Sequence, residues 1–367
     1  MGKTISGKNG MNLTREKIML RNIPLMDGAA FFEGSVSLET MDGGVHPFRL
    51  RSEERPLLNE ELTGRADIAS GVRVVVITDS EVAELDMTVT GSEEEARVDA
   101  VIEGRIVNSC GFMPTGARQT VRFDGLPSGQ KRLELWLPLF GCTTVLALRL
   151  AGGASAERYD DRRPKWITYG SSITMCRTAH SPARTWPAIV ARRHDLNLTS
   201  LGFGGQCHFD PLVARTIRDM PADCISLKLG INTHGEASFT PRTWGPAVLG
   251  FILAVRDGHP DTPLLVCSPI FCRHGESTPN RTDMTLAQMR VILEDLVARL
   301  RDRGDIHIHY LNGLSLFDLP DADQGLMPDD LHPNGDGYEL MGRRFAELAF
   351  ATQGPFNVQK QREIFHG

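Results

Sequence analysis

The chain has 367 residues, of which 41% are hydrophobic and 23% charged, and its net charge is −6. This is the composition of a soluble globular protein with enough residues for two domains. The acidic balance, without a basic block, argues against a nucleic-acid surface, and no run approaches the ~20 apolar residues that a membrane span requires. Because the polar N-terminus lacks the apolar centre of a secretory signal, we expect residues 1–20 to be disordered and the protein to be cytoplasmic.

The first half of the chain predicts a series of short strands. Stretches of alternating apolar and polar residues are separated by turn-forming residues, as in GLPSGQ at 125–130. Such a series is typical of a β-sandwich or jelly roll, which we expect over residues 21–155 with one short helix within 58–71. The predicted strands are 72–79, 83–90, 119–125, 132–138 and 143–150.

The small, polar segment at 151–163, AGGASAERYDDRR, predicts a domain boundary, because the pattern changes after it. Strands then alternate with helices, of which the clearest is expected over 284–304. This alternation predicts an α/β fold with an open, mostly parallel sheet over residues 163–352, followed by a tail at 353–367. The predicted strands of this half are 165–169, 196–201, 224–229, 264–268 and 306–311.

Polar residues collect after these strands, at the sheet edge where α/β proteins bind ligands. A serine, two sources of N–H donors and an Asp/His pair all fall there. The segments that carry them are GSS at 170–172, LGFGGQCH at 201–208, LGINTHG at 229–235 and LMPDDLHPNGDGY at 326–338.

These residue types are the components of acyl transfer through a serine. A serine hydroxyl needs a nearby base, a histidine suits that task near neutral pH, and a carboxylate keeps the imidazole in one tautomer. The tetrahedral intermediate carries a negative oxygen, which preorganised N–H groups stabilise. The sequence therefore predicts a serine-dependent enzyme that acts on esters.

The second half also resembles the SGNH hydrolases, or GDSL esterases, over about residues 165–350. The motif YGSSIT places Ser172 at the nucleophile position, GFGGQ places Gly205 and LGIN places Asn232 in the oxyanion hole, and DDLHPNGDGY gives the Asp-x-x-His pair Asp329 and His332. The resemblance implies a three-layer α/β/α fold with a flavodoxin-like sheet, and the Ser172 N–H as a further oxyanion donor. It also suggests that the sandwich ahead of this domain resembles a carbohydrate-binding module.

Two positions depart from the family pattern. Ser171 stands where the family usually has an aspartate before the nucleophile, and Thr233 stands where it usually has one after the block-three asparagine. Neither position carries a triad role, so the mechanism survives, although the hydrogen bonds around the nucleophile must differ.

Several residues have a structural alternative. A helix N-cap would explain the two serines alone but not the other three motifs. His208, His234, Arg273 and His274 are candidates for the substrate pocket, with a solvated loop as the alternative, and Asp330 is interpreted as a solvated neighbour. Cys267, Cys272 and His274 lack zinc-site spacing, so we expect no metal and no cofactor, and interpret the seven cysteines as unpaired thiols in a reduced protein.

We expect an esterase that acts on a small sugar or metabolite ester through an acyl-serine intermediate. An acyltransferase that moves the acyl group from an ester or thioester to a hydroxyl is the alternative, since both outcomes use the same triad. A catalytically dead, glycan-binding protein is the third reading, and the intact triad argues against it. The expected partners are an acyl ester, or an acyl donor and an alcohol.

Overall fold

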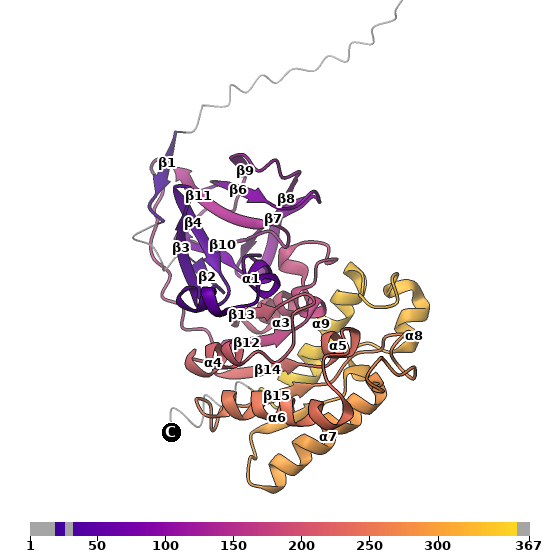
Figure 1. Ribbon diagram of the computed structural model, residues 1–367. Coiled ribbons are helices and arrows are strands. Elements are labelled where there is room, and N and C mark those ends of the chain that lie inside the picture. The colour runs from indigo at the N-terminus through magenta and orange to yellow at the C-terminus, as the bar shows by residue number, and fades with distance from the viewer. Residues whose placement is uncertain (1–18, 26–31, 358–367) are drawn as a thin grey trace, which may run out of the picture.

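The computed structural model describes residues 19–25 and 32–357, which form two antiparallel sheets followed by one parallel sheet (Figure 1). Most of the expected disordered segment 1–20 and of the tail 353–367 lies outside the described residues. None of the described helices combines the length and apolar character needed to cross a membrane.

The N-terminal half is a β-sandwich. One sheet has the order β3-β4-β11-β6-β9 with β1 beside β11, and the other has the order β2-β5-β10-β7-β8. Alternate residues, such as Val74 and Val76 on β5 or Leu133 and Leu135 on β10, point inward and form the core between the sheets. The strands are β1 (Leu20–Ile23), β2 (Phe32–Glu33), β3 (Ser37–Met41), β4 (Gly44–Phe48), β5 (Arg73–Thr78), β6 (Val82–Thr90), β7 (Ala96–Ile102), β8 (Arg105–Phe112), β9 (Gln119–Asp124), β10 (Lys131–Trp136) and β11 (Cys142–Ala151).

The five strands predicted for this half are present, and so is the short helix, α1 (Glu60–Ala66), which follows a 3-10 turn, η2 (Ser52–Leu57). The hairpin of β7 and β8 was not predicted. Its two-residue turn uses Glu103 and Gly104, both with positive φ, and most of β8 is exposed. A strand with no fully buried residue leaves little periodic signal in the sequence.

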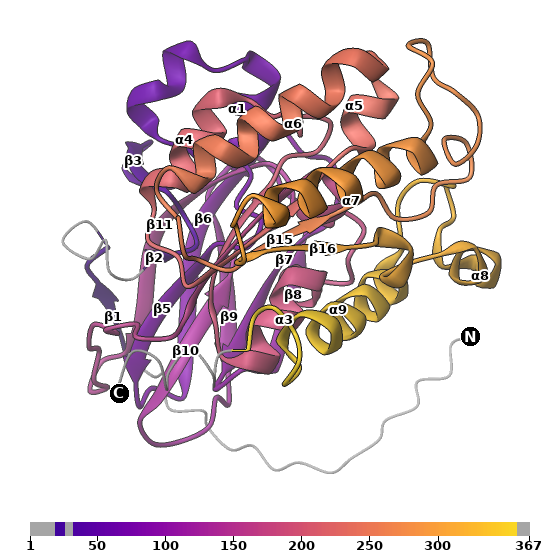
Figure 2. The same ribbon diagram turned by 90° about the horizontal axis from the view of Figure 1, so that it is seen from below.

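The C-terminal half is a five-stranded parallel sheet of order β13-β12-β14-β15-β16, which is the flavodoxin-like order that the family resemblance implied. Helices α4, α6 and α7 cover one face, and α3 and α9 cover the other (Figure 2). The strands are β12 (Lys165–Gly170), β13 (Asn197–Gly202), β14 (Cys224–Lys228), β15 (Leu264–Cys267) and β16 (Ile308–Leu311). The helices are α2 (Ser172–Met175), α3 (Trp186–His194), α4 (Pro211–Asp219), α5 (Ile231–Gly235), α6 (Pro241–Arg256), α7 (Leu286–Asp302), α8 (Leu319–Asp321) and α9 (Gly335–Phe350), with short turns η3 (Pro182–Arg184), η4 (Gly313–Ser315) and η5 (Ala322–Leu326).

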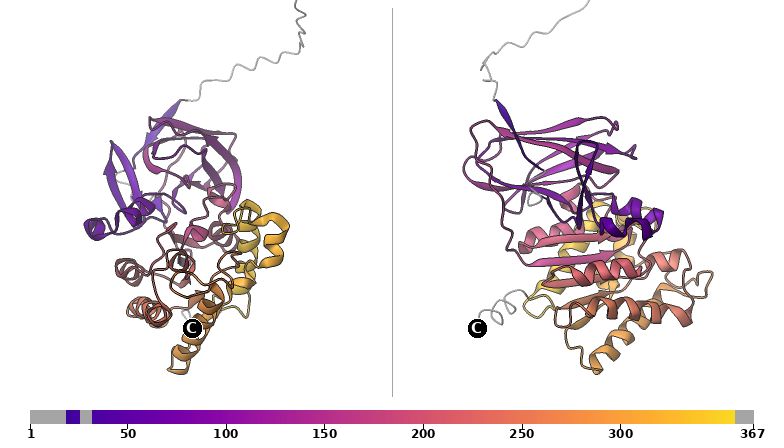
Figure 3. Two further views of the ribbon diagram at one scale, coloured as in Figure 1. Left: turned by 45° about the vertical axis from the view of Figure 1, so that its right-hand side comes forward. Right: turned by 60° about the vertical axis from the view of Figure 1, so that its left-hand side comes forward.

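The sandwich lies against the β13 edge of the parallel sheet (Figures 1 and 3). One continuous cluster of buried apolar side chains joins the two halves, because Phe48, Leu50 and Trp136 of the sandwich belong to the same cluster as Trp166 of β12. The halves therefore share part of their hydrophobic core.

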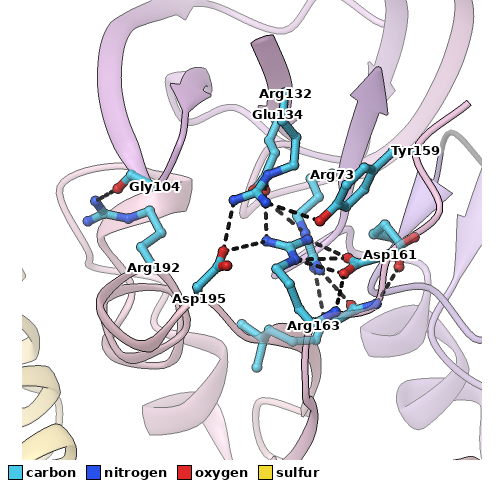
Figure 4. A network of polar contacts seen from close by, with 12 residues as sticks. Arg73, Gly104, Arg132, Glu134, Tyr159, Asp161, Arg163, Arg192 and Asp195 are labelled. Carbon is cyan, nitrogen blue, oxygen red and sulfur yellow. Dashed lines mark hydrogen bonds and ion pairs between the residues drawn. The ribbon is translucent and has the colours of Figure 1, made fainter. Parts of the chain in front are cut away.

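A buried ion-pair network also joins them (Figure 4). The carboxylate of Glu134 is 2% exposed and lies 3.0 Å from Arg132, 2.9 Å from Arg163 and 3.9 Å from Arg73. Arg132 also reaches Asp195, which follows α3, at 2.9 Å. Three guanidinium groups thus converge on one carboxylate, and one of them, that of Arg73, also contacts the edge strand β13.

Candidate active site

The candidate nucleophile stands directly after strand β12, which lies next to the edge strand β13. Ser171 is the N-cap of α2: its hydroxyl accepts a hydrogen bond from Ile173 N at 3.2 Å, and its side chain is fully buried. The N-cap alternative therefore applies to Ser171. Ser172 is the first residue of α2, is only partly buried, and has its hydroxyl available for another partner.

Two glycines let α2 sit close to the sheet. A Cβ at Gly170 would lie 2.3 Å from Thr174 Oγ1, and a Cβ at Gly202 would lie 2.3 Å from Met175 N. A side chain at either position would push the helix, and Ser172 with it, away from the strand ends.

Ser172, His332 and Asp329 form a hydrogen-bonded line. Ser172 Oγ is 2.9 Å from His332 Nε2, and His332 Nδ1 is 2.7 Å from Asp329 Oδ2. With the ring proton on Nδ1, His332 donates a hydrogen bond to the carboxylate of Asp329, and Nε2 is free to accept the proton of the serine hydroxyl. The order of hydroxyl, imidazole and carboxylate is the one that serine-based acyl transfer requires.

Asp329 holds the backbone of its own loop as well as the ring. Its Oδ1 accepts hydrogen bonds from Leu331 N at 3.1 Å and from His332 N at 2.6 Å. Partial burial by itself raises the pKa of Asp329, but the hydrogen bonds from His332 and Leu331 outweigh it and lower that pKa below its ordinary value. One ionised carboxylate therefore fixes both the loop and the imidazole.

The loop that carries His332 is anchored on both sides. Thr178 Oγ1 donates to Pro333 O at 2.8 Å, and Asn334 caps α9 by accepting from Gly337 N at 3.0 Å. These bonds tie the histidine loop to the segment that follows the nucleophile helix.

The candidate oxyanion donors lie on the loop after β13 and in the first turn of α5. Asn232 Oδ1 accepts a hydrogen bond from Cys207 N at 3.1 Å, which leaves the amide nitrogen of Asn232 on the other branch of the side chain. Gly205 has a φ of 74°, a conformation that favours glycine, and the preceding Gly204 packs against Ser172, with a Cβ placed there 3.5 Å from Ser172 Cβ. The loop of Gly205 and the start of α5 are thus joined directly beside the candidate nucleophile.

Residues 164–347 match the sequence pattern described as the GDSL-like lipase/acylhydrolase family, and residues 30–146 match the N-terminal domain of SsfX3. The chain belongs to the GDSL-like lipase/acylhydrolase family. It is therefore a serine esterase or acyltransferase with the SGNH fold. Among curated proteins, a sequence search finds no match.

Solved structures of similar fold include proteins that are named for different activities. The salicylyl-acyltransferase SsfX3 from a tetracycline biosynthetic pathway is 32% identical, with a TM-score of 0.81 over 90% of this chain and 96% of that chain. A GDSL-like lipase from Bacteroides ovatus is 19% identical, with a TM-score of 0.73 over 89% and 96% of the two chains. A family-two carbohydrate esterase from Clostridium thermocellum is 16% identical, with a TM-score of 0.62 over 87% and 97%. The last two likenesses extend to the fold alone.

A cavity of about 760 Å³ opens beside the loop that follows β13, at Gly204 and Gly205. Its walls come from both halves of the chain. From the C-terminal half they include Gly204, Gly205, Gln206, His208 and Glu236, and from the sandwich Glu61, Arg65, Asp67, Ile68, Thr90 and Cys142. The sandwich residues had no signal in the sequence that linked them to the active edge.

The four candidate pocket residues take different places. His208 lines this cavity, with Nε2 2.9 Å from Gly205 O and Nδ1 2.9 Å from Ser238 Oγ. His234 packs instead under the loop at 275, where a Cβ at Gly275 would lie 2.6 Å from its ring. Burial lowers the pKa of His234, so its ring favours the neutral form.

Arg273 and His274 meet protein carboxylates. Arg273 lies 2.9 Å from Asp330 and 2.7 Å from Asp323, and His274 lies 3.6 Å from Asp330. Asp330 is 37% exposed, and in addition it pairs with the loop after β15. This pair holds two active-edge loops together, and no sequence motif connects its members.

The seven cysteines are unpaired, and five of them are buried. Burial raises the pKa of Cys207 and of Cys267 to about 12, so neither is a thiolate near neutral pH. In the described part of the chain, no group of three or more His, Cys, Asp or Glu side chains is arranged to hold a metal ion.

Proposed function

We propose that the chain transfers acyl groups through a covalent acyl-Ser172 intermediate. The observation that carries this proposal is the line of hydrogen bonds from Ser172 through His332 to Asp329. His332 Nε2 takes the hydroxyl proton as Ser172 Oγ attacks the acyl carbon, and then gives that proton to the leaving oxygen or sulfur. Asp329 keeps the ring oriented and stabilises its charged form.

The negative oxygen of the tetrahedral intermediate would be held by the N–H groups of Ser172 and Gly205 and by the Asn232 amide. The hydrogen bond between Asn232 Oδ1 and Cys207 N supports this role, because it fixes the amide before substrate arrives. Preorganisation of this kind matters, since removing one oxyanion donor costs roughly 10²–10³-fold in kcat.

For the second step we propose that the acyl acceptor is a hydroxyl group of a small molecule bound in the cavity between the halves. Two observations favour transfer: the cavity of about 760 Å³ adjoins Gly204 and Gly205, and the 32% identical SsfX3 is named a salicylyl-acyltransferase. The mixture of carboxylate, arginine and histidine side chains around it suits a polar, hydroxylated acceptor.

Hydrolysis is the second candidate outcome. The side chains of His332 and Asp329 are 28% and 54% exposed, so water can approach the base without a rearrangement. Hydrolysis needs only that a water molecule reach the acyl-enzyme before an alcohol does.

The nucleophile is tested with p-nitrophenyl acetate and a serine-directed phosphonate. Wild type should turn over the ester and carry the phosphonate on Ser172, whereas Ser172→Ala should do neither and Ser171→Ala should still be labelled. Absence of both turnover and adduct in the wild type would refute the proposal.

The acceptor is tested with an acyl thioester, offered with and without a panel of hydroxylated small molecules. Faster thioester loss together with a new ester would establish transfer. Thioester loss that no alcohol accelerates, with free acid as the product, would favour the esterase.

A further inference from the structure

The β13 edge of the parallel sheet is covered by arginine side chains instead of another strand. Because β13 is the edge strand, alternate backbone carbonyls along its outer side lack a strand partner. Three arginines of the sandwich, which we call the arginine ladder, bind these carbonyls in order. The bonds are Arg73 to Leu198 O at 2.8 Å, Arg49 to Ser200 O and to Gly202 O at 2.9 Å each, and Arg65 Nε to Gly204 O at 3.0 Å.

The ladder continues beyond the strand. The four carbonyls belong to residues 198, 200, 202 and 204, so they follow the two-residue period of a strand although β13 ends at Gly202. Arg65 therefore extends the edge pairing by one step, into the loop that carries the candidate oxyanion donor Gly205.

The last bond of the ladder acts on the peptide group that contains the Gly205 N–H. In a trans peptide the C=O and the N–H point in opposite directions, so holding Gly204 O toward Arg65 directs the Gly205 N–H away from the sandwich. A charged donor on the carbonyl also polarises the peptide, which strengthens the N–H as a donor.

We propose that Arg65 is a positioning residue for the oxyanion hole, supplied by the N-terminal sandwich. This inference rests on the proposed role of Gly205. Arg65 does not touch the reacting atoms in this arrangement; it sets the direction and donor strength of the backbone N–H that does.

Neighbouring contacts leave the Gly204–Gly205 peptide little freedom. His208 Nε2 lies 2.9 Å from Gly205 O, and Gln206 donates to Glu61, from the same helix as Arg65, at 2.7 Å. The carbonyl of Arg65 itself accepts from Arg49 at 2.5 Å, so the ladder is internally linked. Removal of the Arg65 side chain would release Gly204 O while these other contacts remain.

The experiment compares Arg65→Ala and Arg65→Lys with a control, Arg51→Ala. Arg51 also bridges the halves, through Asp219 at 2.5 Å, but the contact is remote from the 204–205 peptide. For each variant, kcat and KM are measured with p-nitrophenyl acetate, together with the inhibition constant of phenylboronic acid, which forms a tetrahedral adduct on a serine. Circular dichroism and the thermal midpoint report folding.

Arg65→Ala should lose roughly 10-fold or more in kcat with KM nearly unchanged, because the lost interaction serves the transition state. Its boronate affinity should fall by a similar factor, Arg65→Lys should recover part of both, and Arg51→Ala should match wild type. An Arg65→Ala loss that lies only in KM would assign Arg65 to substrate contact and overturn the inference. An Arg65→Ala kcat equal to that of the control would also overturn it.

Failure of the proposed function gives a different result. In that case the wild type itself shows no turnover and no phosphonate adduct on Ser172. A wild type that turns over, beside an Arg65→Ala variant that is equally fast, refutes only the role of Arg65.

Discussion

At the scale of single residues, the site depends on a few side chains with two tasks each. Asp329 orients the imidazole and also holds the backbone N–H groups of its loop. Ser171 caps the nucleophile helix from a position that the family usually gives to aspartate. A neutral hydroxyl suffices there because the bond it must accept, from Ile173 N, is a local helix-cap bond.

Asp329→Asn should reduce kcat by roughly 10³-fold or more, because an amide can stabilise the wrong tautomer of His332 and cannot balance its positive charge. The matched change Asp330→Asn weakens only the pairs with Arg273 and His274 and should stay within about 3-fold of wild type. Steady-state kinetics on one ester measures both. Similar losses in the two variants would contradict the assignment of Asp329.

The ion pair between His46 and Asp67 should make the stability of the protein depend on pH. Burial alone lowers its pKa, but Asp67 at 3.0 Å, together with Cys142 and Thr143 O, raises it to about 10. Since the folded pKa exceeds the unfolded value of about 6.5, the stabilisation is complete below pH ~6.5 and is lost as the pH rises toward 10.

The free energy of unfolding should therefore decline between pH 7 and 10 in wild type and decline less in His46→Gln. Urea titrations at a series of pH values measure it, and parallel curves for the two proteins would contradict the ion pair.

At the scale of elements, the edge strand β13 shows how a backbone is satisfied on the side that has no strand partner. Arg49 is fully buried and donates to Ser200 O, Gly202 O, Ile68 O and Arg65 O. A single guanidinium group replaces several ladder hydrogen bonds, because its donors are fixed in a planar fork.

Arg49→Met should destabilise the protein by about 3 kcal/mol or more, since each buried polar group left without a partner costs roughly 1–3 kcal/mol. Urea denaturation of wild type and variant gives the difference. Arg162→Met, which removes a pair with both side chains highly exposed, serves as the control and should change stability little. A stable Arg49→Met protein would show that water replaces the lost donors.

The elements around the site were predicted to different degrees for physical reasons. The parallel strands and α7 carry continuous or periodic apolar residues, and the Asp-x-x-His pair is local, so sequence patterns reveal them. The bonds from Arg49 and Arg65 to β13 and the loop after it end on backbone carbonyls 139 to 153 residues away, and a carbonyl has no residue type that a pattern could detect. The same holds for Arg273 and Asp330, which only folding brings together.

At the scale of the whole molecule, the two halves share a hydrophobic cluster and a buried ion-pair network. Phe48 and Trp136 pack in the same cluster as the parallel sheet, and Glu134 collects three arginines beneath it. Coupling of this kind favours a single cooperative unit over two independent domains.

Calorimetry should therefore record one unfolding transition, and Glu134→Gln should shift all of it downward. Removing the carboxylate leaves three buried or partly buried guanidinium groups to repel one another, at a cost of about 3 kcal/mol or more. Two resolved transitions, or a shift confined to one of them, would contradict the coupling.

The arginine ladder also limits how the chain can be recombined. A chimera that joins this C-terminal half to a foreign sandwich would expose four hydrogen-bond acceptors along β13 and the loop that follows it, unless the foreign sandwich carried arginines at matching positions. Exchange of the sandwich should therefore succeed between chains that keep these three arginines. The interface between the halves thus favours their inheritance as a single unit.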